Sequence, residues 1–107
     1  MMWTVNYAES ARQDLRDIRE YISDTLSAPV AAMKQVTRIM DATDSLDHMP
    51  LRCRLCDKEP WQSKGLRILP VDNFLVLYLP DESSSTVTVM RIMYGRRDIY
   101  EQLDTTE

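Results

Sequence analysis

Residues 91–100 of this 107-residue chain, RIMYGRRDIY, bring together residue types that can bind phosphate and act on it. Guanidinium groups bind phosphate through paired hydrogen bonds, and a tyrosine hydroxyl can donate a proton where cations surround it. The candidate side chains are Arg91, Tyr94, Arg96, Arg97 and Tyr100. The segment is therefore either a phosphate site with a catalytic tyrosine or the solvated end of a strand.

The net charge limits the partners that such a site can have. Thirteen Lys and Arg residues against 17 Asp and Glu residues give the chain a formal charge of −4. An acidic chain lacks the long-range attraction to polyanions that non-specific nucleic-acid binding requires. Any contact with nucleic acid must therefore be local, through the two basic segments at residues 52–67 and 91–97.

Two cysteines form a second candidate site. Cys53 and Cys56 make a CxxC pattern, and His48 lies shortly before it. Structural zinc takes four ligands, and a redox dithiol opens a helix that follows a strand, which is not the order of this sequence. We therefore predict two reduced thiols in a loop, with no metal site and no cofactor.

The spacing of apolar residues predicts the elements that position these side chains. It indicates one helix through Ala11 and Leu26 and a second from Pro29 to about Asp47, with Ser27 as its N-cap. Four strands are expected at Trp3–Tyr7, Leu66–Val71, Phe74–Leu79 and Thr86–Tyr94, with a loop over residues 48–64 and one or two helical turns over residues 98–103. The predicted fold is one α+β domain over residues 1–107, in which a strand and an antiparallel two-helix hairpin precede a three-stranded antiparallel meander. The helices cover one face of the single sheet.

The expected central strand, Phe74–Leu79, is apolar on both faces. Since successive side chains point to opposite faces and the helices cover only one, the other face is expected to expose Leu75 and Leu77. Arg91 is expected to emerge on that same face, and Arg67 to lie on the preceding strand. A protein partner is therefore predicted to cover this face.

The N-terminal segment gives an expectation about location. MMWTVNYAES has no basic leader followed by an apolar stretch, and the longest apolar run in the chain is far shorter than a membrane span. We expect a soluble, cytoplasmic protein that does not contact membranes.

Four segments, in this order, carry a resemblance. They are Tyr7-x3-Ala11-x2-Asp14-Leu15-x2-Ile18-x2-Tyr21-Ile22, Gly65-Leu66-Arg67, Asn73-Phe74-Leu75-Val76-Leu77-Tyr78 and Arg91-Ile92-x-Tyr94-Gly95-Arg96-Arg97-Asp98. From about Val5 to Leu103 the chain resembles the RelE/ParE superfamily, the toxins of bacterial type II toxin–antitoxin or plasmid-stabilisation modules. The resemblance implies the fold predicted above and a cognate antitoxin that docks a helix and an added strand onto the toxin.

The resemblance leaves two activities open. RelE-like members cut mRNA on the ribosome without a metal, whereas ParE-like members inhibit DNA gyrase and have no known catalysis. RelE-like nucleases carry a phosphate-binding arginine on the central strand, and Leu75 stands at that place here. Arg97 matches the family's arginine after the last strand, and Tyr100 matches its tail tyrosine with a shorter spacing. Because leucine cannot bind phosphate, the resemblance favours the ParE-like branch.

We therefore predict a toxin that a cognate antitoxin neutralises and that inhibits growth by binding DNA gyrase. The predicted target- or antitoxin-binding residues are Arg67, Leu75, Leu77, Arg91, Arg96 and Arg97. Two alternatives stay open: a ribosome-dependent mRNA endonuclease that uses Arg91, Arg97 and Tyr100, and a degenerate toxin that only binds its antitoxin. The chain is expected to form a homodimer or a toxin–antitoxin hetero-oligomer.

Overall fold

The computed structural model describes residues 2–95 and 103. Its elements, in chain order, are β1 (Thr4–Tyr7), α1 (Glu9–Glu20), a π-helical turn (Tyr21–Thr25), α2 (Pro29–Asp44), two 3-10 turns (Ser45–Asp47 and Pro50–Arg52), β2 (Arg54–Leu55), α3 (Trp61–Lys64), β3 (Arg67–Val71), β4 (Phe74–Asp81) and β5 (Thr86–Tyr94). The predicted helical turns at residues 98–103 lie outside the described residues, except for Leu103.

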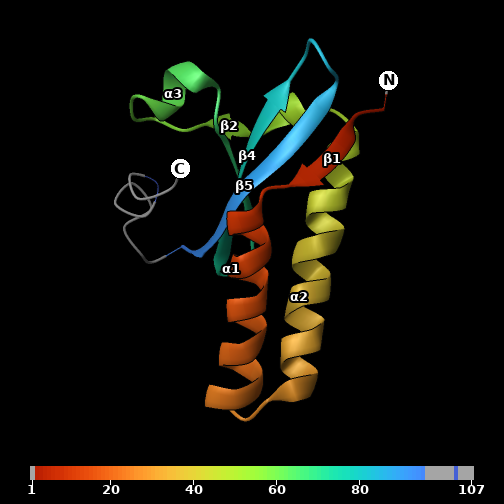
Figure 1. Ribbon diagram of the computed structural model, residues 1–107, viewed down its shortest axis with the longest axis vertical. Coiled ribbons are helices and arrows are strands. Elements are labelled where there is room, and N and C mark those ends of the chain that lie inside the picture. The colour runs from red at the N-terminus through yellow and green to blue at the C-terminus, as the bar shows by residue number, and fades with distance from the viewer. Residues whose placement is uncertain (1, 96–102, 104–107) are drawn as a thin grey trace.

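The five strands form one sheet in the order β1-β5-β4-β3-β2 (Figure 1). Strands β2 to β5 pair antiparallel, and β1 pairs parallel to β5. Helices α1 and α2 form an antiparallel hairpin that reaches well beyond the strands (Figure 1). The predicted α+β class, with a helix hairpin before an antiparallel meander, is confirmed. Strand β2 and helix α3 arise from residues that the sequence predicted to be a loop.

The turn between the two helices differs from the prediction. Ser27 has a left-handed backbone, with a φ of 51°. An N-cap residue instead has extended backbone angles, so the prediction of Ser27 as the N-cap is wrong. Ala28 takes that position, and Pro29 follows as the first helical residue, where its missing N–H costs nothing.

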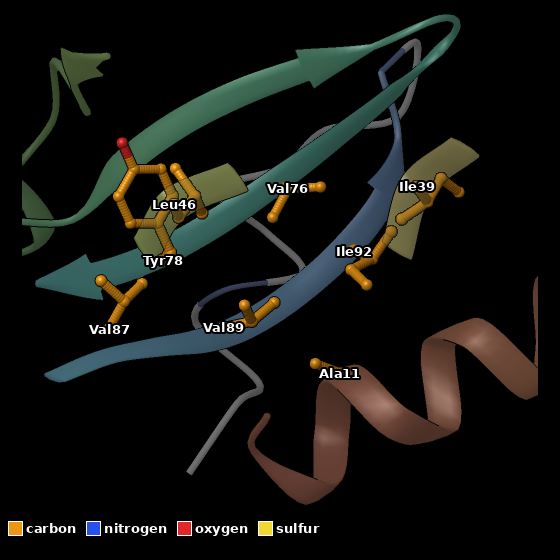
Figure 2. Close-up of a cluster of buried hydrophobic side chains, with 8 residues drawn as sticks. All are labelled: Ala11, Ile39, Leu46, Val76, Tyr78, Val87, Val89 and Ile92. Atoms are coloured by element: carbon orange, nitrogen blue, oxygen red, sulfur yellow. The ribbon is translucent and has the colours of Figure 1, made fainter. Parts of the chain in front are cut away.

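The main core lies between the helix hairpin and the sheet. Figure 2 shows its buried side chains: Ala11, Ile39, Leu46, Val76, Tyr78, Val87, Val89 and Ile92. They come from both helices, from the 3-10 turn after α2 and from the two central strands. This cluster joins the hairpin to β4 and β5.

A β-bulge in β5 sets which of its side chains enter that core. Tyr78 pairs with Val89 and Leu77 pairs with Arg91, so Met90 is the extra residue of the bulge. Beyond the bulge it is Ile92 that continues on the helix side. Without the extra residue, the period of two that starts at Val89 would put Arg91 there instead.

The second face of the sheet is covered by the chain itself, which corrects the prediction of an uncovered apolar face. Its buried cluster consists of Cys56, Leu66, Ile68, Leu77, Met93 and Leu103, with Trp61, Leu75, Leu79 and Met90 packed around it. Leu77 has no exposed surface, and Leu75 is half-buried. The prediction failed because the apolar residues of the segment before β3 were assigned to a loop and were not expected to cover the sheet. That segment folds back over the sheet through α3.

The described residues include no helix that is both long and apolar enough to span a membrane.

Candidate functional site: a cleft between the helix hairpin and the sheet

A cleft of about 1040 Å³ opens between the far end of the helix hairpin and the strands β4 and β5. Its apolar lining comes from Ile18, Ile22, Leu26, Ala31, Phe74, Ile92 and Met93. Its polar and aromatic lining comes from Asp14, Asp17, Tyr21, Gln35, Asn73, Arg91 and Tyr94. The hairpin projects past the strands at this end (Figure 1), and Tyr21 and Leu26 near its tip line the cleft.

The outer rim of the cleft is apolar and open to solvent. Tyr21, in the π-helical turn, is 57% exposed, and Leu26 is 54% exposed. Large apolar side chains on a concave surface are typical of protein–protein interfaces, in which aromatic residues are enriched. The geometry of this rim therefore fits an apolar segment of another protein.

An ion pair between Asp14 and Arg91 forms one wall of the cleft. Asp14 Oδ2 accepts a hydrogen bond from Arg91 Nε at 2.7 Å, and Asp14 Oδ1 accepts one from Arg91 Nη2 at 3.0 Å. Asp14 Oδ2 also accepts the backbone N–H of Ile92 at 2.9 Å. The two side chains are only 13% and 16% exposed. This pair fastens α1 to the edge of β5.

The position of Arg91 differs from the prediction. Its backbone pairs opposite Leu77, on the face without the hairpin, as the alternation of the strand requires. Strand β1 ends at Tyr7, which pairs with Val89, so the edge of β5 beyond Val89 faces α1. The long Arg91 side chain reaches Asp14 at that edge. The expectation that its guanidinium emerges on the helix-free face is therefore wrong.

The turn between β3 and β4 closes another side of the cleft. Asp72 accepts hydrogen bonds from Arg38 Nη2 at 2.7 Å and from Gln35 Nε2 at 3.1 Å, which ties α2 to the turn. Phe74 and Tyr94 pack edge to face across β4 and β5, with ring centroids 5.8 Å apart. The first of these contacts joins α2 to the turn, and the second joins β4 to β5 beside the opening.

Arg67 lies away from the cleft and holds a loop. Its Nη1 donates to the backbone carbonyls of Leu51 at 3.0 Å and Cys53 at 2.6 Å. Beside it, the Tyr78 hydroxyl donates to the Pro50 carbonyl at 2.6 Å. Burial raises the pKa of Tyr78 well above its ordinary value, and Cys53 raises it further. These contacts give Arg67 a structural role in binding the 50–53 loop to the sheet.

The predicted site residues that the structure describes lie in different places. Arg91 lines the cleft, Arg67 lies on β3 under the 50–53 loop, and Leu75 and Leu77 face the second core. Arg96, Arg97 and Tyr100 lie outside the described residues, so their roles remain predictions.

Sequence reasoning missed the acidic part of the cleft, although a signal for it was present. Asp14 follows Ala11 by three residues and precedes Ile18 by four, so it lies beside the buried stripe of α1. A carboxylate at such a position requires a cation or hydrogen-bond donors. That requirement pointed to a partner such as Arg91, 77 positions later.

The two cysteines lie on opposite sides of the sheet. Cys53 packs against the core under the helices, and Cys56 is buried in the second core. Both are free thiols, and the described residues contain no group of three or more His, Cys, Asp or Glu side chains arranged to hold a metal ion.

The sequence pattern of the family described as "ParE toxin of type II toxin-antitoxin system, parDE" matches residues 5–99. The chain belongs to the ParE toxin family. In this ParE-family toxin the match covers the elements from α1 to β5 and all of β1 except its first residue. No curated protein matches the chain.

Solved structures of related toxins share the fold. A chain from the chromosomal ParDE system of P. aeruginosa is 21% identical, with a TM-score of 0.71 over 87% of this chain and 96% of that one. A chain from the RelBE2 toxin–antitoxin complex of Mycobacterium tuberculosis is 21% identical, with a TM-score of 0.63 over 88% and 99%. A mutant of the E. coli toxin RelE in the free state is 10% identical, with a TM-score of 0.65 over 95% and 93%. At these identities the likeness concerns the fold.

Proposed function

We propose that this ParE-family toxin is neutralised by a cognate antitoxin, part of which occupies the cleft between the helix hairpin and the sheet. The observation that carries the proposal is the apolar cleft itself, with Tyr21 and Leu26 exposed at its rim. Burying such side chains against a partner contributes free energy in proportion to the apolar area removed from water. An amphipathic segment of the antitoxin fits this cleft.

We further propose that the toxin inhibits growth by binding DNA gyrase and not by cutting RNA. A nuclease of this superfamily requires positive charge around a scissile phosphate, and Leu75 stands where the resemblance places the central-strand arginine. Arg91, another candidate for that chemistry, is paired with Asp14 in the wall of the cleft. Both observations support an inhibitor that acts by binding.

Purified gyrase and plasmid DNA test the target directly. We expect the toxin to inhibit supercoiling at micromolar concentration and the antitoxin to reverse that inhibition. Undisturbed supercoiling, combined with toxin-dependent cuts in translated mRNA by primer extension, would establish the nuclease alternative. Growth without arrest, combined with retained antitoxin binding, would establish a degenerate toxin.

The cleft is tested by measuring the binding of the cognate antitoxin. Leu26→Glu places a charge at the exposed rim, where the fold tolerates it, and we expect antitoxin affinity to fall by at least about tenfold. Met49→Glu is the matched control, because Met49 is 74% exposed and lies outside the cleft. Equal affinities of the two variants in calorimetry would place the antitoxin elsewhere.

A further inference from the structure

Helix α2 carries an apolar stripe on its exposed side. The stripe consists of three apolar residues, Val30, Met33 and Met40, with the polar Thr37 between the two methionines. The intervals of three, four and three residues place all four on one side of a helix. Val30 is 67% exposed, Met33 is 71% exposed and Met40 is 41% exposed. This is the spacing with which one helix packs along another.

The stripe is distinct from the surfaces already described. The buried residues of α2 are Ala32, Ile39 and Thr43, which face the core. The residues of α2 that line the cleft are Ala31 and Gln35. The stripe lies on a third side of the helix, so a partner bound there leaves the cleft open.

The charges beside the stripe indicate what covers it. Lys34 and Asp41 are both exposed and are seven residues apart, so they flank the stripe on the same side, about 10 Å apart along the axis. If a second α2 lies antiparallel, Lys34 of each copy comes level with Asp41 of the other. In a symmetric parallel pair, the charged flanks of the two copies would lie on opposite sides of the seam, so Lys34 and Asp41 would form no ion pair between the copies. The charge pattern is therefore complementary to itself in one direction only.

We propose that the toxin self-associates through α2, as a two-fold symmetric pair of antiparallel helices packed along the Val30–Met40 stripe. With the two-fold axis between Thr37 and Arg38, Met33 of one copy lies about 3 Å along the axis from Met40 of the other. Two flexible methionine side chains adapt to such an offset. The contact is isologous, so the same residues serve on both copies.

The size of the stripe sets the expected strength of the pair. Helix α2 has 16 residues, and its length is therefore about 24 Å. One stripe on a helix of this length is smaller than the standard interface of about 800 Å² per partner. We expect a reversible dimer with a dissociation constant in the micromolar range.

Sedimentation equilibrium from about 1 to 200 µM tests the pairing. We expect the mass to rise from monomer to dimer for the wild type and for Met49→Glu, and to stay monomeric for Met33→Glu. Both substituted methionines are more than 70% exposed, so the fold is preserved, and circular dichroism checks this. A wild type that remains monomeric over this range overturns the proposal.

A charge exchange tests the antiparallel direction. Lys34→Glu and Asp41→Lys should each weaken the dimer, because each single change brings like charges level across the interface. The double variant Lys34→Glu/Asp41→Lys restores the complementarity and should recover a dissociation constant within about threefold of the wild type. If the double variant is weaker than both single variants, the antiparallel pairing is wrong.

Discussion

The Asp14 carboxylate accepts hydrogen bonds from the Arg91 side chain and from the Ile92 backbone, at the point where β1 no longer covers the edge of β5. At 13% and 16% exposure, the charges of the pair are largely withdrawn from water. Removing one member of such a pair leaves the other charge poorly compensated. We therefore assign to Asp14 the role of holding α1 against the sheet and shaping the cleft wall.

At this scale, Asp14→Asn should lower the free energy of unfolding by about 2–4 kcal/mol, because the half-buried Arg91 Nε and Nη2 then donate to a neutral amide in place of a carboxylate. Asp17→Asn, on the same helix but exposed, should change it by less than about 0.5 kcal/mol. Urea denaturation followed by circular dichroism measures both values. Equal stabilities of the two variants would show that the ion pair contributes nothing.

The buried Tyr78 hydroxyl gives a dependence on alkaline pH. Its pKa is raised above the ordinary value of 10.0, so the folded protein keeps the proton after the unfolded chain has lost it. The contribution of Tyr78 to the free energy of unfolding is therefore fully present below pH 10. Above pH 10 it falls by up to about 1.4 kcal/mol per pH unit. Tyr78→Phe should show a shallower decline between pH 10 and 11 in urea denaturation. A decline as steep as that of the wild type would contradict this assignment.

At the scale of elements, hydrophobic periodicity predicted the two helices and the four longer strands. It did not predict β2 and α3, which have two and four residues. Elements this short contain too few residues to show a repeating pattern of apolar side chains. Their structure depends on tertiary contacts: β2 pairs with β3, and α3 brings Trp61 over the sheet. The predicted apolar binding face was wrong for this reason, because its cover came from a segment without periodicity.

Sequence reasoning about the cleft was limited in a similar way. The components Ile18, Ile22 and Phe74 were assigned correctly to helices and a strand, but the cleft depends on how far the hairpin projects past β4 and β5. That distance follows from packing between elements far apart in the sequence. The pairing of Asp14 with Arg91 could not be predicted for the same reason, because it depends on where β1 ends along β5.

Helix α3 can be tested as a cover. Trp61→Ala should destabilise the fold by about 1–3 kcal/mol and increase the fluorescence of an added hydrophobic dye, since Leu77 and Leu75 lose part of their cover. Gln62→Ala, exposed on the same helix, should do neither. If dye binding rises equally in both variants, α3 does not shield the second core.

At the scale of the whole molecule, α2 serves two surfaces that share no residue of the helix. Gln35 and Ala31 line the cleft, and the Val30–Met40 stripe lies on another side. Two copies joined through the stripe would therefore present two open clefts. Binding of antitoxin and self-association are expected to be energetically independent.

Independence of the two surfaces gives a crossed prediction. Leu26→Glu should reduce antitoxin affinity by at least about tenfold and leave the dissociation constant of the dimer unchanged, whereas Met33→Glu should do the reverse. Calorimetry measures the first quantity and sedimentation equilibrium the second. A variant that lowers both affinities would show that the stripe and the cleft form one surface.

The parallel pairing of the first strand with the last has a consequence for timing. Thr4 of β1 pairs with Thr86 of β5, which is synthesised 82 residues later. At ordinary rates of protein synthesis, the ribosome needs roughly 4–16 s to add those residues. The helices can form during that interval. The cleft cannot, because two of its lining residues, Ile92 and Tyr94, belong to β5. A nascent chain that still lacks β5 therefore has no cleft for an antitoxin to bind. An antitoxin that binds in the cleft can act only on a toxin molecule in which β5 has already joined the sheet.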